Sequence, residues 1–227
     1  MSDEFEMESG PVTDRAVPGP KLYAHTVMPK KQLTAMVGVI HGYADHGGRY
    51  VHVMEKWASR GIGSIAIDLR GHGRADGPRG YCSRFDEYLD DAAELARKID
   101  DRAKGVPTFL FGHSFGGLVA AMSTIENSRS WKGVILSNPF FGLALKVPRI
   151  KLLAGKIASR IVPKLGIPSG LSGKDLTHDL ARAKTYDEDP LGFPNATARW
   201  FTETERAQAQ AIARASELAL PLYMLFG

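Results

Sequence analysis

A serine between glycines is the first feature of this chain that could do chemistry. The run GHSFG, residues 112–116, matches G-x-S-x-G, a pattern whose central serine is a nucleophile. Residues 107–111 (PTFLF) before it are typical of a short buried strand, and residues 115–127 after it carry apolar side chains at helical spacing. A serine on so sharp a turn lies in strained backbone, and the glycines let strand and helix approach closely. The pattern predicts a nucleophile at Ser114.

A second loop could stabilise the negative charge that a serine attack creates. The segment VGVIHGYADHGGRY, residues 37–50, reads as a strand followed by His-Gly and a glycine-bearing loop. Acyl-transfer enzymes with this turn take one oxyanion N–H from the residue after the nucleophile and one from the loop after the third strand. Those positions are Phe115 and Tyr43. The competing interpretation, that the glycines only turn the loop, is weakened by the serine turn nearby.

Two further patterns fail as cofactor or metal motifs. Glycines follow a strand at Gly71-x-Gly73, but the dinucleotide pattern then requires glycine where Asp76 stands. The histidines have neither the helical i, i+4 spacing of zinc motifs nor cysteine partners; the four considered are His41, His46, His72 and His113. We expect no metal and no cofactor.

Composition indicates an ordinary globular protein. Hydrophobic residues make up 44% and charged residues 24% of the 227-residue chain, which is enough length for one α/β domain. The net charge of +4 is too small to argue for a nucleic-acid partner, and the lone Cys82 excludes an internal disulfide. The first ten residues are acidic, unlike a signal peptide, and no apolar run approaches roughly 18 residues. We expect a cytoplasmic protein.

Strand and helix patterns alternate along most of the chain, which predicts a mostly parallel sheet flanked by helices. Residues 1–20 hold three prolines and no periodic pattern, so they are expected to form a mobile lead-in. The expected strands are 21–28, 34–40, 63–68, 107–111 and 133–136, and the expected helices are 50–60, 85–104 and 115–127.

The alternation stops after Pro139. Residues 140–215 show helical patterns but no convincing strand, and a strand pattern then resumes at Leu220–Gly227. This predicts a core over residues 21–139, a helical cap over 140–215, and a return to the core over 216–227. Part of the cap, Phe141–Pro168, is basic: its six cations, with no acidic residue, are Lys146, Arg149, Lys151, Lys156, Arg160 and Lys164.

Apolar residues recur at helical spacing within this basic segment, at Ile150, Leu153, Ile157 and Ile161. A basic amphipathic helix can lie on an anionic membrane surface, which predicts transient membrane contact through the cap and a peripheral location. The alternative is a solvated helix packed on its own domain.

Together these stretches resemble serine hydrolases of the α/β-hydrolase fold, in the branch of monoacylglycerol lipases, lysophospholipases and related esterases. The resemblance runs from about residue 21 to 227. The residues that carry it are His41-Gly42-Tyr43, His46, Arg49-Tyr50, Asp68, Arg70-Gly71-His72-Gly73, Asp76-Gly77, Phe85-Asp86 and Gly112–Gly117. It implies Ser114 as nucleophile, the N–H groups of Tyr43 and Phe115 as oxyanion donors, and a lipid-like ester as the small-molecule substrate.

The sequence departs from that family in its acid and base. In this fold the chain order is serine, then Asp or Glu, then histidine. After Ser114 the only histidine is His178, inside the predicted cap, and no carboxylate follows the strand that ends at Gly227. The resemblance therefore implies that a last strand and helix, with the acid and base, are absent, and that these 227 residues alone are inactive.

Two function classes follow. The first is a serine esterase whose full-length form carries the complete triad. The second is a non-catalytic module or inactive fragment of the same fold that acts in binding. Thioesterase and peptidase activities also stay open, because a fold does not fix a substrate.

Overall fold

The computed structural model describes residues 4–14, 16, 18–127, 131–142 and 149–227. Its centre is a seven-stranded sheet in the order β1-β2-β4-β3-β5-β6-β9. The strands are β1 (Phe5–Val12), β2 (Leu22–Pro29), β3 (Ala35–Ile40), β4 (Ile62–Asp68), β5 (Thr108–His113), β6 (Gly133–Ser137) and β9 (Leu222–Leu225).

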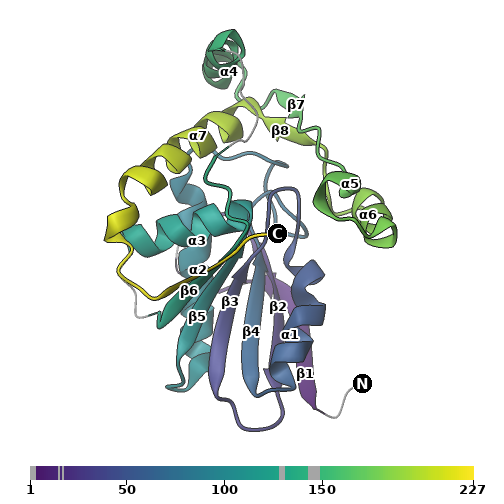
Figure 1. Ribbon diagram of the computed structural model, residues 1–227, viewed down its shortest axis with the longest axis vertical. Coiled ribbons are helices and arrows are strands. Elements are labelled where there is room, and N and C mark those ends of the chain that lie inside the picture. The colour runs from purple at the N-terminus through teal and green to yellow at the C-terminus, as the bar shows by residue number, and fades with distance from the viewer. Residues whose placement is uncertain (1–3, 15, 17, 128–130, 143–148) are drawn as a thin grey trace.

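The pairing confirms the predicted mostly parallel sheet. From β4 through β3, β5 and β6 to β9 every neighbouring pair is parallel, whereas β1 and β2 are antiparallel additions at one edge. Helix α1 (Val51–Ala58) packs on β2 and β4, while α2 (Asp86–Ala103) and α3 (Phe115–Glu126) pack on the strands from β4 to β6 (Figure 1). The predicted helices are confirmed to within a few residues at each end.

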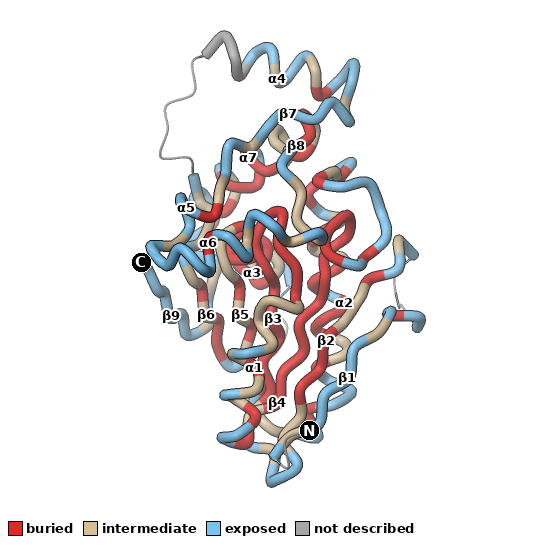
Figure 2. Tube along the Cα trace, turned by 90° about the vertical axis from the view of Figure 1, so that its right-hand side faces the viewer, coloured by how far each residue is buried: buried red, intermediate tan, exposed pale blue. Residues whose placement is uncertain are grey.

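Strand β3 shows why its sequence is a continuous apolar run. Met36 and Ile40 belong to the hydrophobic cluster that includes the buried residues of α2 and α3, whereas Val37 and Val39 belong to the cluster that includes Met54 of α1. A parallel strand covered on both faces needs apolar residues at every position. The deep burial of β3 and β4 is visible in Figure 2.

The expected lead-in without regular structure is wrong for residues 5–12. They form β1, which pairs with β2 along its whole length, from Phe5 opposite Pro29 to Val12 opposite Leu22. Most of β1 is exposed, and its apolar alternation is limited to Phe5–Glu8 because Ser, Gly and Pro follow, so the sequence does not reveal a strand of eight residues. Pro11 is compatible with this position because β1 is an edge strand.

The segment between β6 and β9 contains helices, as predicted, and also two short strands that the sequence does not predict. Its elements are α4 (Arg149–Ile161), β7 (Gly166–Pro168), α5 (Gly173–Leu176), α6 (Leu180–Asp187), β8 (Asn195–Thr197), α7 (Ala198–Ala213) and the short 3-10 helix η2 (Ala215–Glu217). Strands β7 and β8, of three residues each, pair antiparallel. Ladders so short leave no periodic signal in the sequence.

This segment, called the cap from here on, lies beyond the carboxyl ends of the parallel strands (Figure 1). Helix α7 contacts both α4 and α3, and its Trp200, Ala207 and Ala211 join the main hydrophobic cluster. Of the basic residues expected here, Lys146 lies outside the described residues. Within the described part of the chain, no helix has the length and apolar character needed to cross a membrane.

Strand β9 returns to the sheet, as predicted, beside β6. Its residues remain exposed, from 36% for Met224 to 62% for Tyr223, and the following Phe226 is 74% exposed (Figure 2). A groove over β5, β6 and β9, about 300 Å³ in volume, is lined by apolar groups that include Phe109, Ile135 and Leu222.

Candidate active site

Ser114 occupies the turn between β5 and α3. Its backbone has φ 51° and ψ −117°, a left-handed conformation that costs energy for any residue other than glycine. The surrounding backbone holds it there: the Ser114 N–H donates to the Ser137 carbonyl at 2.9 Å, and the Ser114 carbonyl accepts from Gly117 and Phe140, each at 2.9 Å. The strained serine turn predicted from the sequence is present.

The glycines around Ser114 are required by close backbone contacts. A Cβ atom on Gly116 would lie 2.2 Å from the carbonyl oxygen of Ile40, and one on Gly112 would lie 2.3 Å from that of Gly116. No side chain can be placed at such distances, so the first turn of α3 can lie against the end of β3 only with glycine there. This accounts for both glycines of the G-x-S-x-G pattern.

The loop after β3 lies beside the serine because β3 and β5 are neighbours in the sheet, with Ile40 opposite Gly112. A Cβ atom on Gly42 would be 3.5 Å from that of Ser114, so the two loops touch. No described residue accepts a hydrogen bond from the Tyr43 N–H. We refer to residues 41–46 as the oxyanion loop, because Gly42 contacts Ser114 and Tyr43 is the candidate oxyanion donor.

The Tyr43 side chain packs against the cap. Its hydroxyl donates to the Asn195 carbonyl of β8 at 2.8 Å, and its ring lies 3.8 Å from that of Trp200 and 5.3 Å from that of Phe193, measured between ring centroids. Burial raises the pKa of this hydroxyl, so it stays protonated and remains a donor. Phe115 is fully buried beneath Tyr43.

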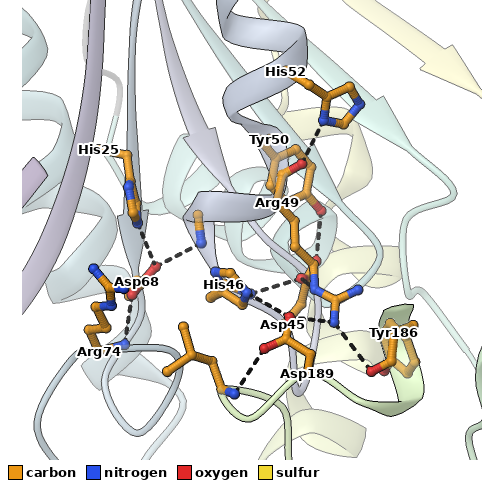
Figure 3. A network of polar contacts seen from close by, with 12 residues as sticks. His25, Asp45, His46, Arg49, Tyr50, His52, Asp68, Arg74, Tyr186 and Asp189 are labelled. Carbon is orange, nitrogen blue, oxygen red and sulfur yellow. Dashed lines mark hydrogen bonds and ion pairs between the residues drawn. The ribbon is translucent and has the colours of Figure 1, made fainter. Parts of the chain in front are cut away.

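Buried polar side chains fix both ends of the oxyanion loop. His41 accepts a hydrogen bond at Nε2 from the Leu69 N–H at 3.0 Å. The carboxylate of Asp68, which is fully buried, accepts from the N–H groups of Gly47 and Arg74, each at 2.7 Å (Figure 3). Between these anchors Ala44 has φ 54°, so the loop itself holds a strained residue.

A polar network joins this loop to the cap (Figure 3). Asp189, in the turn after α6, accepts from His46 Nε2 at 3.0 Å and from Arg49 Nη2 at 2.7 Å. Arg49 Nε lies 3.2 Å from Asp45, whose other oxygen accepts from the Tyr50 hydroxyl at 3.0 Å. Both His46 and Arg49 stand out in the sequence, whereas nothing in the local sequence marks Asp189.

The histidines near the serine are occupied in other ways. His113 Nδ1 lies 3.1 Å from the Ser137 hydroxyl, and burial lowers the pKa of His113. His178 is exposed between α5 and α6. Among the described residues, no side chain forms a hydrogen bond with the Ser114 hydroxyl, and no group of three histidine, cysteine or acidic side chains could hold a metal ion. Among the described residues, the site thus brings together the candidate nucleophile Ser114 and the candidate oxyanion positions Tyr43 and Phe115.

Comparison with known proteins agrees with this geometry. Residues 31–227 match the family model described as serine aminopeptidase, S33. A phospholipase of Bacillus subtilis, YtpA, is 35% identical over 171 residues, which are 74% of this chain and 65% of that protein. Human monoglyceride lipase is 28% identical over 177 residues, or 76% of this chain and 57% of that protein.

A solved structure extends the comparison to the fold. The monoacylglycerol lipase of Paleococcus ferrophilus superposes with a TM-score of 0.78 at 28% identity, covering 91% of this chain and 77% of that one. The chain thus spans 65% and 57% of the two relatives above, and 77% of this one. With its serine turn, oxyanion loop and mostly parallel sheet, the chain belongs to the serine aminopeptidase S33 family and has the α/β-hydrolase fold.

Proposed function

We propose that the protein is a serine hydrolase that cleaves lipid-like carboxylic esters through an acyl-enzyme on Ser114. The observation that carries this proposal is the contact between the strained Ser114 and the oxyanion loop at Gly42. A carbonyl attacked by the Ser114 hydroxyl would place its oxygen near the N–H groups of Tyr43 and Phe115. Two such donors stabilise the tetrahedral intermediate, and removal of one typically costs ~3–4 kcal/mol of transition-state free energy.

We propose that the general base is a histidine oriented by a carboxylate. This fold orders its triad as serine, acid and histidine, and the Bacillus and human relatives are longer than this chain. In the first step the base removes the Ser114 proton as Oγ bonds to the ester carbon. The alcohol then leaves with a proton from the same base, and water releases the acid by the reverse sequence.

The surface of the cap supports a lipid-like substrate over a water-soluble one. Along α4, the apolar side chains Leu153, Ile157 and Ile161 are 59%, 50% and 74% exposed. The same helix buries a polar residue instead: Ser159 is 4% exposed and bonds to Thr202 of α7 at 2.8 Å. The helix thus turns its apolar side away from the protein, which is the arrangement of a helix that meets a lipid surface.

Cations flank this apolar surface. Lys156 and Arg160 of α4 and Lys164 just after it are exposed, and the nearest carboxylate to Lys156 is that of Glu205, 3.8 Å away. We infer that α4 contacts an anionic lipid surface transiently while the cap delivers substrate to Ser114. Two of the relatives are named for lipid hydrolysis, the human monoglyceride lipase and the Bacillus phospholipase.

A substrate panel tests the proposal. Full-length protein is assayed with a long-chain monoacylglycerol, a short-chain water-soluble ester and an aminoacyl anilide, alongside Ser114→Ala. We expect the highest kcat/KM for the monoacylglycerol and loss of turnover in the variant. Preference for the anilide would favour an aminopeptidase instead, and no turnover of any substrate would favour a non-catalytic module.

A further inference from the structure

The turn that follows α6 contacts the oxyanion loop directly. A Cβ atom on Gly192 of this turn would lie 3.5 Å from the Ala44 carbonyl oxygen. Ala44 is the residue at φ 54°, which follows the candidate donor Tyr43. The cap therefore contacts the oxyanion loop at Ala44, the residue whose backbone is strained.

Asp189 fixes this turn to the loop. Its Oδ1 accepts from the Leu191 N–H at 2.9 Å, which shapes the turn, while its Oδ2 accepts from both His46 and Arg49. The guanidinium of Arg49 also lies 4.5 Å from the centre of the Tyr186 ring in the cap. Burial alone would raise the pKa of Asp189, but hydrogen bonding to His46 and the charge of Arg49 outweigh it and hold that pKa below the ordinary value.

From Arg49 the contacts continue to the serine. Arg49 pairs with Asp45, and Asp45 is held in place by the Tyr50 hydroxyl and by the N–H of His46 at 2.8 Å. A Cβ atom on Gly42 would lie 3.7 Å from Asp45 Oδ2 and 3.5 Å from Ser114 Cβ. Asp189 thus bonds to His46 at the end of the oxyanion loop and to Arg49 just after it, and Gly42 of the same loop contacts Ser114.

We propose that Asp189 is a positioning residue for the oxyanion donor Tyr43, acting through His46 and Arg49, so that the cap completes the catalytic loop rather than only covering it. The Tyr43 amide is useful only if it points at the developing oxyanion, and a displacement of about 1 Å can cost on the order of a hundredfold in rate. A strained loop without its contact from the cap loses that alignment. The kinetic consequence rests on the proposed ester hydrolysis, but the positioning itself does not.

The kinetic test uses full-length protein and a short, water-soluble ester that does not need the lipid-facing surface. We expect Asp189→Ala to lower kcat about ten- to hundredfold with little change in KM, and the isosteric Asp189→Asn to lower it less. The matched control is Glu188→Ala, the adjacent carboxylate, whose ion pair with Lys184 lies within the α6 region. The double variant His46→Gln, Asp189→Ala should lower kcat little more than Asp189→Ala alone, because both substitutions remove the same contact between the cap and the oxyanion loop.

A second measurement does not depend on turnover. Hydrogen exchange of the backbone amides in residues 41–46 should accelerate in Asp189→Ala, with the sheet amides of β4 unchanged, at a temperature where melting curves show the variant folded. Wild-type kcat in Asp189→Ala, an increase in KM alone, or unchanged exchange of the loop would overturn the proposal. If wild-type protein cleaves no ester while the exchange result holds, the proposed function fails and the positioning role stands.

Discussion

Gly42 and Ser114 lie in contact at the carboxyl ends of neighbouring strands, with 3.5 Å between the Ser114 Cβ and the position of a Cβ on Gly42. This contact brings the candidate nucleophile and the candidate oxyanion loop together although they are far apart in the chain. It exists because Gly116 lets the start of α3 approach the end of β3. The glycine contacts are therefore the first feature to test.

Gly116→Ala should destabilise the protein severely and distort the serine turn. The new methyl would lie 2.2 Å and 2.3 Å from the carbonyl oxygens of Ile40 and His41, and backbone cannot yield as a flexible side chain can. The matched control is Gly155→Ala on α4, where nothing lies within 4 Å, and alanine should stabilise that helix by about 0.5–1 kcal/mol. Denaturant unfolding of both variants measures the difference; equal stabilities would contradict these contacts.

The sequence predicts the serine turn well because its signals are local. The pattern G-x-S-x-G, with a strand before it and a helix after it, specifies the turn at Ser114 within a few residues. The buried strands are equally recognisable, since a strand covered on both faces is apolar throughout. The exposed strand β1 has no such signal, and only its partner β2 makes it a strand.

The connection between Asp189 and His46 could not be predicted in this way. These residues are 143 positions apart, and their contact depends on how the cap folds back over the sheet. No periodicity or spacing encodes that placement. The apolar residues of α4 were recognised from the sequence, but only the structure shows that the helix buries Ser159 and exposes Ile157.

Asp91→Ala should cost about 3–5 kcal/mol of unfolding free energy, because it leaves the mostly buried Arg70 with only its longer ion pair to Glu87, at 3.4 Å. The fully buried Asp91 carboxylate accepts from the Arg70 guanidinium at 2.7 and 2.9 Å and from the Arg70 N–H at 3.0 Å. Burial alone lowers the pKa of Arg70, but its bonds to Asp91 outweigh this and raise it.

The control for this experiment is Lys184→Ala, which breaks an exposed ion pair with Glu188 and should cost less than about 1 kcal/mol. Urea denaturation gives both values. A loss below 1 kcal/mol for Asp91→Ala would show that the loop after β4 does not depend on this pair.

Acid should destabilise the protein through its buried histidines. Burial lowers the pKa of His72 to about 3, whereas an unfolded histidine titrates near 6.5. The unfolded state therefore binds the extra proton first, and stability that is present above pH about 6.5 is lost as the pH falls toward 3, by up to about 1.4 kcal/mol per pH unit. Burial also lowers the pKa values of His25, His41 and His113.

His72→Gln should reduce the slope of unfolding free energy against pH between 6.5 and 5, whatever the variant does to stability at pH 7. The reduction should be at most about 1.4 kcal/mol per pH unit, which corresponds to one bound proton. Urea unfolding at a series of pH values measures this slope. A slope identical to that of the wild type would show that His72 is not kept neutral by the fold.

Charge reversal on the cap should weaken lipid binding. Lys156→Glu combined with Arg160→Glu removes two exposed cations beside Ile157, so binding to vesicles containing anionic lipid should fall, and the difference should fade at high salt. Lys31→Glu, an exposed cation in the loop between β2 and β3, is the matched control. Vesicle co-sedimentation measures binding, and binding insensitive to both the reversal and salt would refute the lipid-facing cap.

The central claim is that Ser114 is the nucleophile, and covalent labelling tests it most directly. Full-length protein is treated with a serine-reactive phosphonate, and the modified residue is located by mass spectrometry of the peptide that contains residues 112–117. We predict a single label on Ser114, absent from Ser114→Ala and retained in Ser123→Ala, whose hydroxyl donates to the Ala120 carbonyl on the same helix. Undiminished labelling of Ser114→Ala, or a label on another serine, would contradict the account.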